Sequence, residues 1–109
     1  MKLYISGKIS GLDPEVYLGN FARAEVNLKQ QGYEVINPAR TNSTLPPSTS
    51  YSQYMEMSML LLSFCDGIYL LKNWTKSPGA QKEKARAEEL GLKVFYEKEG
   101  NDALQTEKA

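Results

Sequence analysis

Short apolar segments alternate with stretches of helical periodicity along this chain of 109 residues. Four of the segments predict β-strands, over residues 2–6, 33–36, 67–71 and 92–96. Strands that alternate with helices predict right-handed βαβ units, in which parallel strands lie side by side between layers of helices. We therefore predict an α/β fold with a parallel sheet of about four to five strands, flanked by helices.

Capping signals predict where the helices between these strands begin and end. A capping residue followed by proline predicts helix starts at residues 14 and 78, and glycine ends these helices near residues 32 and 91. Ser50 and Gln53 match a capping box, which predicts another helix over residues 51–64. Methionine and leucine occur nearly all round that helix, so we expect it to be well buried. The intervening segment 37–50 predicts a long loop of a kind that often binds ligands.

The length of the chain permits one domain, which we place over residues 1–96, followed by a polar tail over residues 97–109. The tail has little periodicity, and we expect either disorder or a short helix that docks on a neighbour. The 13 basic and 13 acidic residues balance and form no basic block, which argues against a nucleic acid polymer as a partner. A formal net charge of zero also permits the chain to associate with itself.

Residues that the sequence lacks exclude several kinds of chemistry. The absence of histidine excludes Ser-His-Asp and Cys-His catalysis and leaves no ligand set for zinc, so we expect no metal site. Neither a Walker loop nor a G-x-G-x-x-G motif is present, and we expect no cofactor. The sequence shows no leader peptide and no apolar run of membrane-spanning length, and the lone Cys65 fits a reducing compartment. We therefore expect a cytoplasmic protein without a membrane partner.

Glu83 is the most informative residue for function. It shares one face of the third predicted helix with small and apolar residues, which predicts that its carboxylate is partly buried. Burial raises the pKa of a carboxyl group and a helix N-terminus lowers it, a combination typical of catalytic groups. Alternatively, Glu83 lies at the edge of this face and pairs with Lys82 or Arg86.

Parallel sheets bind ligands beyond the carboxyl ends of their strands. Three segments must meet there, over residues 7–11, 37–50 and 72–79. Candidates for substrate binding in these segments are glycines, which let backbone amides approach a ligand, and the polar, apolar and aromatic side chains beside them. They are Gly7, Lys8, Ile9, Ser10, Gly11, Asn37, Trp74, Ser77 and Gly79.

Each of these candidates has a plain structural alternative. Ser77 and Gly79 begin the third helix, where a hydroxyl binds a phosphate or a ribose, or simply caps the helix. The loop over residues 7–11 binds an anion, or only makes the turn after the first strand. Tyr4 and Trp74 stack on a base or fill the core.

Two segments resemble signatures of a known family. The segments YISGKISG, from residue 4, and SPGAQKE, from residue 77, resemble those of the nucleoside 2-deoxyribosyltransferase superfamily, which includes the 2'-deoxynucleoside 5'-phosphate N-hydrolases. Cys65-Asp66 before an apolar strand, followed by Trp74, is similar to short bacterial and phage members. The resemblance extends over residues 1 to about 96 and implies a flavodoxin-like or Rossmann-like sheet. It also implies cleavage or transfer at the N-glycosidic bond of a nucleoside or nucleoside 5'-monophosphate.

The resemblance implies roles for individual residues as well. Glu83 matches the nucleophile that forms a covalent glycosyl-enzyme, and Tyr4 matches the tyrosine that orients it. Ser77 matches a serine that contacts the 5'-phosphate. Ser58 stands where the family has an aspartate that helps to protonate the leaving base. Family members form dimers or larger assemblies that share a pocket, which implies a homodimer here.

Departures from the family pattern leave other functions open. Lys8 and Ser10 stand where the hydrolases carry serine and arginine, and Ser58 is not an acid. A non-catalytic nucleotide-binding or sensor module would keep the pocket without that acid. The spacing Gly79-x-x-x-Glu83 is also similar to phosphoribohydrolases that act on nucleoside monophosphates.

Overall fold

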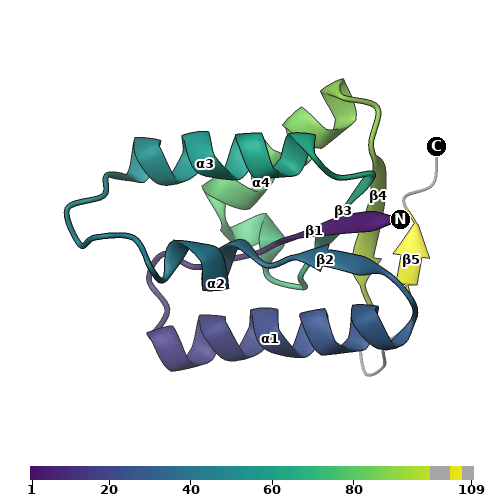
Figure 1. Ribbon diagram of the computed structural model, residues 1–109, viewed down its shortest axis with the longest axis horizontal. Coiled ribbons are helices and arrows are strands. Elements are labelled where there is room, and N and C mark those ends of the chain that lie inside the picture. Colours follow the sequence, from purple (N-terminus) through teal and green to yellow (C-terminus); the bar gives the residue numbers. More distant parts are fainter. Residues whose placement is uncertain (99–103, 107–109) are drawn as a thin grey trace.

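The computed structural model describes residues 1–98 and 104–106, which form one sheet with helices on both faces (Figure 1). The strands are β1 (Lys2–Ser6), β2 (Glu34–Ile36), β3 (Gly67–Leu70), β4 (Lys93–Glu97) and β5 (Leu104–Thr106). The helices are α1 (Pro14–Gln30), α2 (Pro38–Asn42), α3 (Tyr51–Ser63) and α4 (Pro78–Glu89), with a 3-10 turn η1 (Trp74–Lys76). The strand order is β2-β1-β3-β4-β5, and the first four strands run parallel. The predicted α/β fold with a parallel sheet is confirmed.

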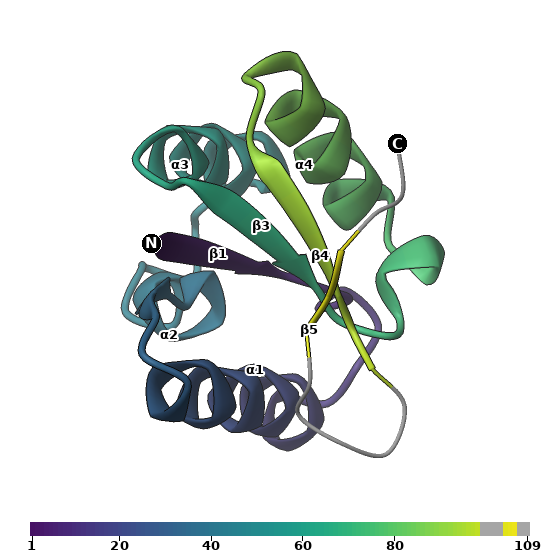
Figure 2. The same ribbon diagram turned by 90° about the vertical axis from the view of Figure 1, so that its right-hand side faces the viewer.

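The two faces of the sheet carry separate apolar cores. Figure 2 shows α1 on one face and α3 with α4 on the other. Leu3 and Ile5 on β1 belong to the core under α1, whereas Tyr4 belongs to the core that contains Leu62 of α3. Side chains alternate across a strand, so Ser6 points to the same face as Tyr4. This alternation aims two hydroxyl groups of β1 at α4.

The helix starts follow their capping signals, including one inside the predicted loop. The capping box at Ser50 and Gln53 is present, with hydrogen bonds of 2.8 and 3.2 Å. Instead of a single long loop over residues 37–50, the structure has α2. Asn37 caps this helix and Pro38 occupies its first turn, the same combination that begins α4. The segment is therefore partly ordered by a local signal.

α3 is less buried than its composition predicts. Ser58 and Leu62 are buried, but Leu60 and Phe64 are 54% and 56% exposed. The helix packs on its neighbours along one side, where Met59 and Leu61 also contact the core. Among the helices of residues 1–98, none has both the length and the apolar content that a membrane crossing requires.

The polar tail contains a strand, although its sequence suggests none. β5 runs antiparallel to β4, with Phe95 opposite Thr106 and Glu97 opposite Leu104. Its partner is the free edge of the sheet, and such tertiary pairing overrides weak local patterning. Residues 99–103 and 107–109 lie outside the described part of the chain, so the prediction for them stays a prediction.

Candidate active site

A cavity of about 930 Å³ lies beyond the carboxyl end of β1. Its walls come from the loop after β1, the start of α1, α2 and the residues after it, one face of α3, and the first turns of α4. Gly7 allows the loop after β1 to pass close to Leu71, because a Cβ atom at this position would approach Leu71 Cδ1 to 2.6 Å. A cavity of this volume holds a ligand the size of a nucleotide.

Glu83 lies in the wall of this cavity, 7% exposed, and is held by hydroxyl groups. Tyr4 Oη donates to Glu83 Oε2 at 2.6 Å, and Ser6 Oγ donates to Glu83 Oε1 at 2.6 Å. Within the described residues Glu83 forms no ion pair. Lys82 instead lies over the ring of Tyr51, 5.4 Å from its centroid. The alternative of a surface pair is therefore wrong, and the carboxylate sits inside the site.

The surroundings of Glu83 act on its pKa in opposite directions. Burial raises the pKa above its ordinary value, while the hydroxyl groups of Ser6, Tyr4 and Ser58 lower it, and the net effect is upward. The pKa of Tyr4 is raised well above 10.0, mainly by burial and also by the negative charge of Glu83. Tyr4 therefore keeps its proton near neutral pH and acts as a hydrogen-bond donor. A nucleophilic carboxylate needs this kind of fixed orientation.

Positive charge collects at the other polar part of the cavity. Lys8, Lys76 and Lys82 line it, and within the described residues Glu83 is the only carboxylate that does so. Ser77 caps α4 by accepting from the backbone N–H of Ala80 at 3.1 Å, and both residues line the cavity. The N-terminus of a helix, together with nearby ammonium groups, favours an anion such as phosphate.

Most of the predicted site residues meet at this cavity. Tyr4 lies directly behind Glu83 and reaches it through its hydroxyl group. Ser58 enters from α3 and is buried beside Glu83 and Tyr4. The other predicted residues that line the cavity are Gly7, Lys8, Ile9, Ser10, Ser77 and Gly79.

Three predicted residues, Gly11, Asn37 and Trp74, lie outside the cavity lining. Asn37 uses both ends of its amide elsewhere, because Nδ2 donates to Glu25 and Oδ1 accepts from the backbone of Arg40. The Trp74 ring packs on Tyr96 with the two ring centroids 6.0 Å apart. Gly11 has a φ of 84° and makes the turn that precedes α1. A position near a strand end was too weak a signal for these residues.

The sequence contained signals for two groups that were missed. Ser6 lies two residues after Tyr4, so the alternation of β1 already placed it on the face that holds Glu83. Tyr51 and Tyr54 lie three residues apart on α3, a spacing that puts both on one helix face, and both line the cavity. Asn42 lines it from α2, where no helix was predicted.

Comparison with known proteins identifies a family and a fold relative. Residues 1–96 match the model of a family described as a domain of unknown function, DUF4406. Among solved structures, the chain is similar to a 2-deoxyribosyltransferase from the psychrotolerant bacterium Bacillus psychrosaccharolyticus, with a TM-score of 0.69 and 17% sequence identity. The match covers 88% of this chain and 71% of that one. The structural similarity shows a common fold, and at this sequence identity it shows nothing beyond the fold. A search of curated proteins found no match.

Proposed function

The chain belongs to the DUF4406 family, a domain of unknown function, and from its site we propose an enzyme that breaks N-glycosidic bonds. The proposed substrate is a nucleoside or, preferably, a nucleoside 5'-monophosphate. The observation that supports this most directly is Glu83, a buried carboxylate in the cavity wall that two hydroxyl groups orient and no cation neutralises within the described residues. The carboxylate is thus both oriented and free to react.

The proposed reaction proceeds through a covalent intermediate on Glu83. One carboxylate oxygen attacks the anomeric carbon of the sugar and forms an ester bond, while the bond from that carbon to the base breaks. The electron pair of the broken bond stays on the base nitrogen, which takes a proton from water. Water, or a second base, then attacks the same carbon and releases Glu83. Tyr4 and Ser6 keep the carboxylate in one orientation throughout.

Three lysines against one carboxylate support the choice of a phosphorylated substrate. Lys8 Nζ donates to the backbone oxygen of Lys76 at 3.3 Å, which brings its charge next to the start of α4. Ser77 and the helix N-terminus lie at the same place. Charge-assisted hydrogen bonds to phosphate are about twice as strong as neutral ones. A 5'-phosphate bound here would position the sugar toward Glu83. The similar solved structure is a 2-deoxyribosyltransferase, which agrees with a nucleoside-type substrate.

A second candidate function is nucleotide binding without turnover. It is favoured by one observation: apart from Glu83, the described residues that line the cavity include no carboxylate. The family resemblance agrees with this, because it aligns Ser58 with the aspartate that helps to protonate the leaving base. General acid catalysis typically contributes about 10²–10⁴-fold, so its loss matters. Such a module would bind a ligand saturably and release no base.

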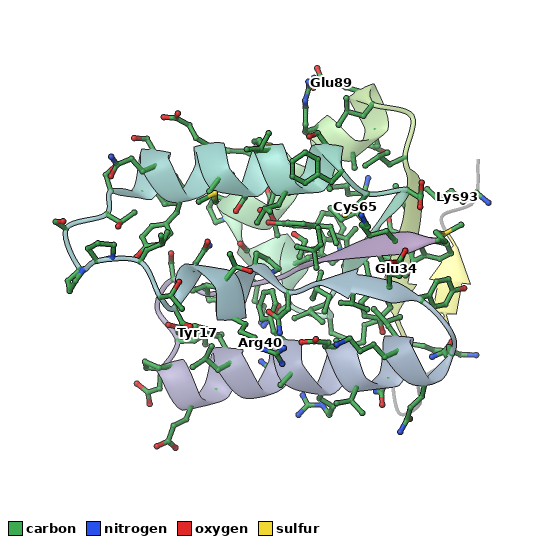
Figure 3. All side chains as sticks on the ribbon, in the orientation of Figure 1. Tyr17, Glu34, Arg40, Cys65, Glu89 and Lys93 are labelled. Carbon is green, nitrogen blue, oxygen red and sulfur yellow. The ribbon has the colours of Figure 1, made fainter. Side chains whose placement is uncertain are left out.

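Chromatographic detection of free base separates these functions. The substrates are ribonucleosides, 2'-deoxynucleosides and their 5'-monophosphates, tested with the parent chain, with Glu83→Gln and with Glu89→Gln. Glu89 is a matched control because it lies at the opposite end of α4 (Figure 3). We expect release with the parent and the control and none with Glu83→Gln. Saturable binding without release would favour the binding module, and release that survives Glu83→Gln would remove Glu83 from the mechanism.

We also propose that the chain forms a homodimer. The support is an apolar surface at the end of α3, where Leu60 and the capping residue Phe64 are mostly exposed and lie four residues apart. Single exposed apolar residues are common, but adjacent large ones mark an association surface more often. Sedimentation at micromolar concentration should show a dimer, and Leu60→Lys should shift it to monomer. A monomer in the parent chain would contradict the proposal.

A further inference from the structure

Asn42 carries a buried side-chain atom that has no hydrogen-bond partner. Its Oδ1 is the one such atom among the residues that the structure describes. Asn42 is the last residue of α2 and lines the cavity. Because an unpaired buried acceptor destabilises a folded protein, native structures contain few of them. As the side chain stands, this atom is closed off from the cavity that Asn42 lines, so it meets a donor on a ligand only when the amide turns toward the cavity.

The neighbours of Asn42 do not satisfy its acceptor. The hydroxyl groups of Thr41, Ser43 and Thr44 each donate to a backbone carbonyl oxygen of the same segment, at 2.6–3.3 Å. A hydroxyl group has a single proton to donate, so these three donors are committed. The acceptor of Asn42 therefore has no local partner because of the way this segment folds.

The backbone of α2 is held firmly in place next to α1. Arg40 Nη2 pairs with Glu25 Oε1 at 2.8 Å, and Figure 3 shows Arg40 between α2 and α1. Asn37 donates to the same carboxylate at 3.0 Å and caps α2. The position of Asn42 along the cavity wall is thereby fixed. Its terminal amide can still turn, since this torsion is broad in asparagine.

Asn42 lies on the apolar side of the cavity, away from the lysines. Ala39, one helical turn before it, is buried in the core against which Tyr17 and Leu18 pack, and all four residues line the cavity. Figure 2 shows α2 and α4 on opposite sides of β1. A nucleotide whose phosphate binds at the start of α4 therefore extends its base toward Asn42.

We propose that Asn42 recognises the base of the nucleotide, an inference that rests on the proposed function. Its Oδ1 accepts from the exocyclic amino group of adenine or cytosine, and its Nδ2 donates to the adjacent ring nitrogen. Asparagine pairs with adenine through the same two atoms in protein–DNA complexes. Beside N7, hypoxanthine carries a carbonyl oxygen where adenine carries the amino group, so that edge has no donor. Uracil also lacks the amino group, but its ring N–H pairs with a turned amide, so the purine pair is the sharper test.

The test measures binding by titration calorimetry, with Glu83→Gln in the full chain so that no ligand is consumed. The ligands are two pairs of 5'-monophosphates, each in ribo and 2'-deoxy forms. Adenosine 5'-monophosphate is compared with inosine 5'-monophosphate, and cytidine 5'-monophosphate with uridine 5'-monophosphate. In at least one pair the amino-bearing member should bind about tenfold more tightly, as a bidentate amide–base contact provides. Adding Asn42→Leu should abolish this preference, and adding Asn42→Asp, which keeps the acceptor, should retain it.

The outcomes separate this inference from the proposed function. Equal affinity within both pairs, or a preference that survives Asn42→Leu, would overturn the role of Asn42 and leave glycosidic cleavage standing. No binding of any nucleotide would overturn both. Thermal melting checks that each variant folds. If Asn42→Leu does not fold, Asn42→Asp decides alone, because loss of the preference in that variant would overturn the inference.

Discussion

Glu25 and Glu83 are buried to nearly the same degree, 5% and 7% exposed, but their surroundings are opposite in kind. Glu25 on α1 pairs with Lys29 at 2.7 Å and with Arg40 at 2.8 Å, and also accepts from Asn37. Glu83 on α4 accepts from the hydroxyl groups of Tyr4 and Ser6, and among the described residues no cation pairs with it. One carboxylate is neutralised and the other is not.

The difference appears in the pKa values of the two groups. Burial raises the pKa of Glu25, but Lys29, Asn37 and Arg40 together lower it more, and the net shift is downward. Burial dominates at Glu83, and its pKa is raised. A carboxylate paired with cations fastens α1 to α2 and has little reactivity to offer. A carboxylate oriented by neutral donors beside a cavity retains its nucleophilic lone pairs, which is why we assign the chemistry to Glu83.

The largest expected effect separates the two residues by activity. Glu83→Gln should lower kcat/KM for base release by at least about 10³-fold, because the nucleophile is lost. Glu25→Gln should lower it far less, since glutamine still accepts from Asn37 and keeps α2 in place. Steady-state rates on the same substrate measure both. Similar losses in the two variants would show that Glu83 acts through the fold and would end its assignment as nucleophile.

Stability should separate the same two variants in the reverse order. Glu25→Gln removes charge-assisted bonds to Lys29 and Arg40, which we expect to destabilise the chain by about 2 kcal/mol. The value is below that of a fully buried pair because the two cations are 56% and 65% exposed. Glu83→Gln removes a buried charge while its amide still bonds both hydroxyl groups, so stability should hold or rise. Urea unfolding at neutral pH decides, and a greater loss in Glu83→Gln would contradict the comparison.

The sequence was sufficient to predict most of the Glu83 side of this comparison, although the hydroxyl group of Ser6 was missed. Apolar runs predicted the four parallel strands, and cap-proline signals predicted two of the helix starts. One stripe of α4 and a resemblance in two short segments brought Glu83 and Tyr4 together. These signals are local, because they depend on spacing within a single strand or helix.

The Glu25 side depends on contacts between distant segments, and the sequence did not reveal it. Glu25 and Arg40 are fifteen positions apart, and nothing in their spacing indicates an ion pair. Asn37 was predicted to bind substrate because it follows a strand, yet its amide is taken up by Glu25 and by the cap of α2. Only tertiary packing determines which of these polar groups remain free for a ligand.

A smaller effect tests the hydroxyl groups that hold Glu83. Tyr4→Phe removes the hydroxyl group that donates to Glu83 Oε2. Because that hydrogen bond lowers the pKa of Glu83, the pKa should rise further in the variant. The acidic limb of kcat/KM, which follows ionisation of the nucleophile, should then move to higher pH. The same variant should lose about 1 kcal/mol in stability, because a buried oxygen loses its partner. A pH–rate profile measures the shift, and an unchanged limb would show that the limb does not report Glu83.

The smallest effect is the pH dependence of stability, and its sign differs between the two carboxylates. The folded-state pKa of Glu25 lies below its ordinary value of 4.5, so its stabilisation is present above that pH and is lost as the pH falls through the lowered pKa. The pKa of Glu83 is raised from 4.5, so stability decreases as the pH rises from there through the raised pKa.

Urea unfolding over a pH series tests this difference in sign. The deficit of Glu25→Gln relative to the parent chain should shrink as the solution is acidified below about pH 4.5, where the parent loses the same contribution. The advantage of Glu83→Gln should grow as the pH rises above that value, because only the parent must ionise a buried group. Each slope is limited to about 1.4 kcal/mol per pH unit for one proton. If both variants followed the parent curve at a constant offset, neither carboxylate would differ in pKa between the folded and the unfolded chain in this range. The contrast in charge compensation between the two sites would then have no measurable consequence for folding.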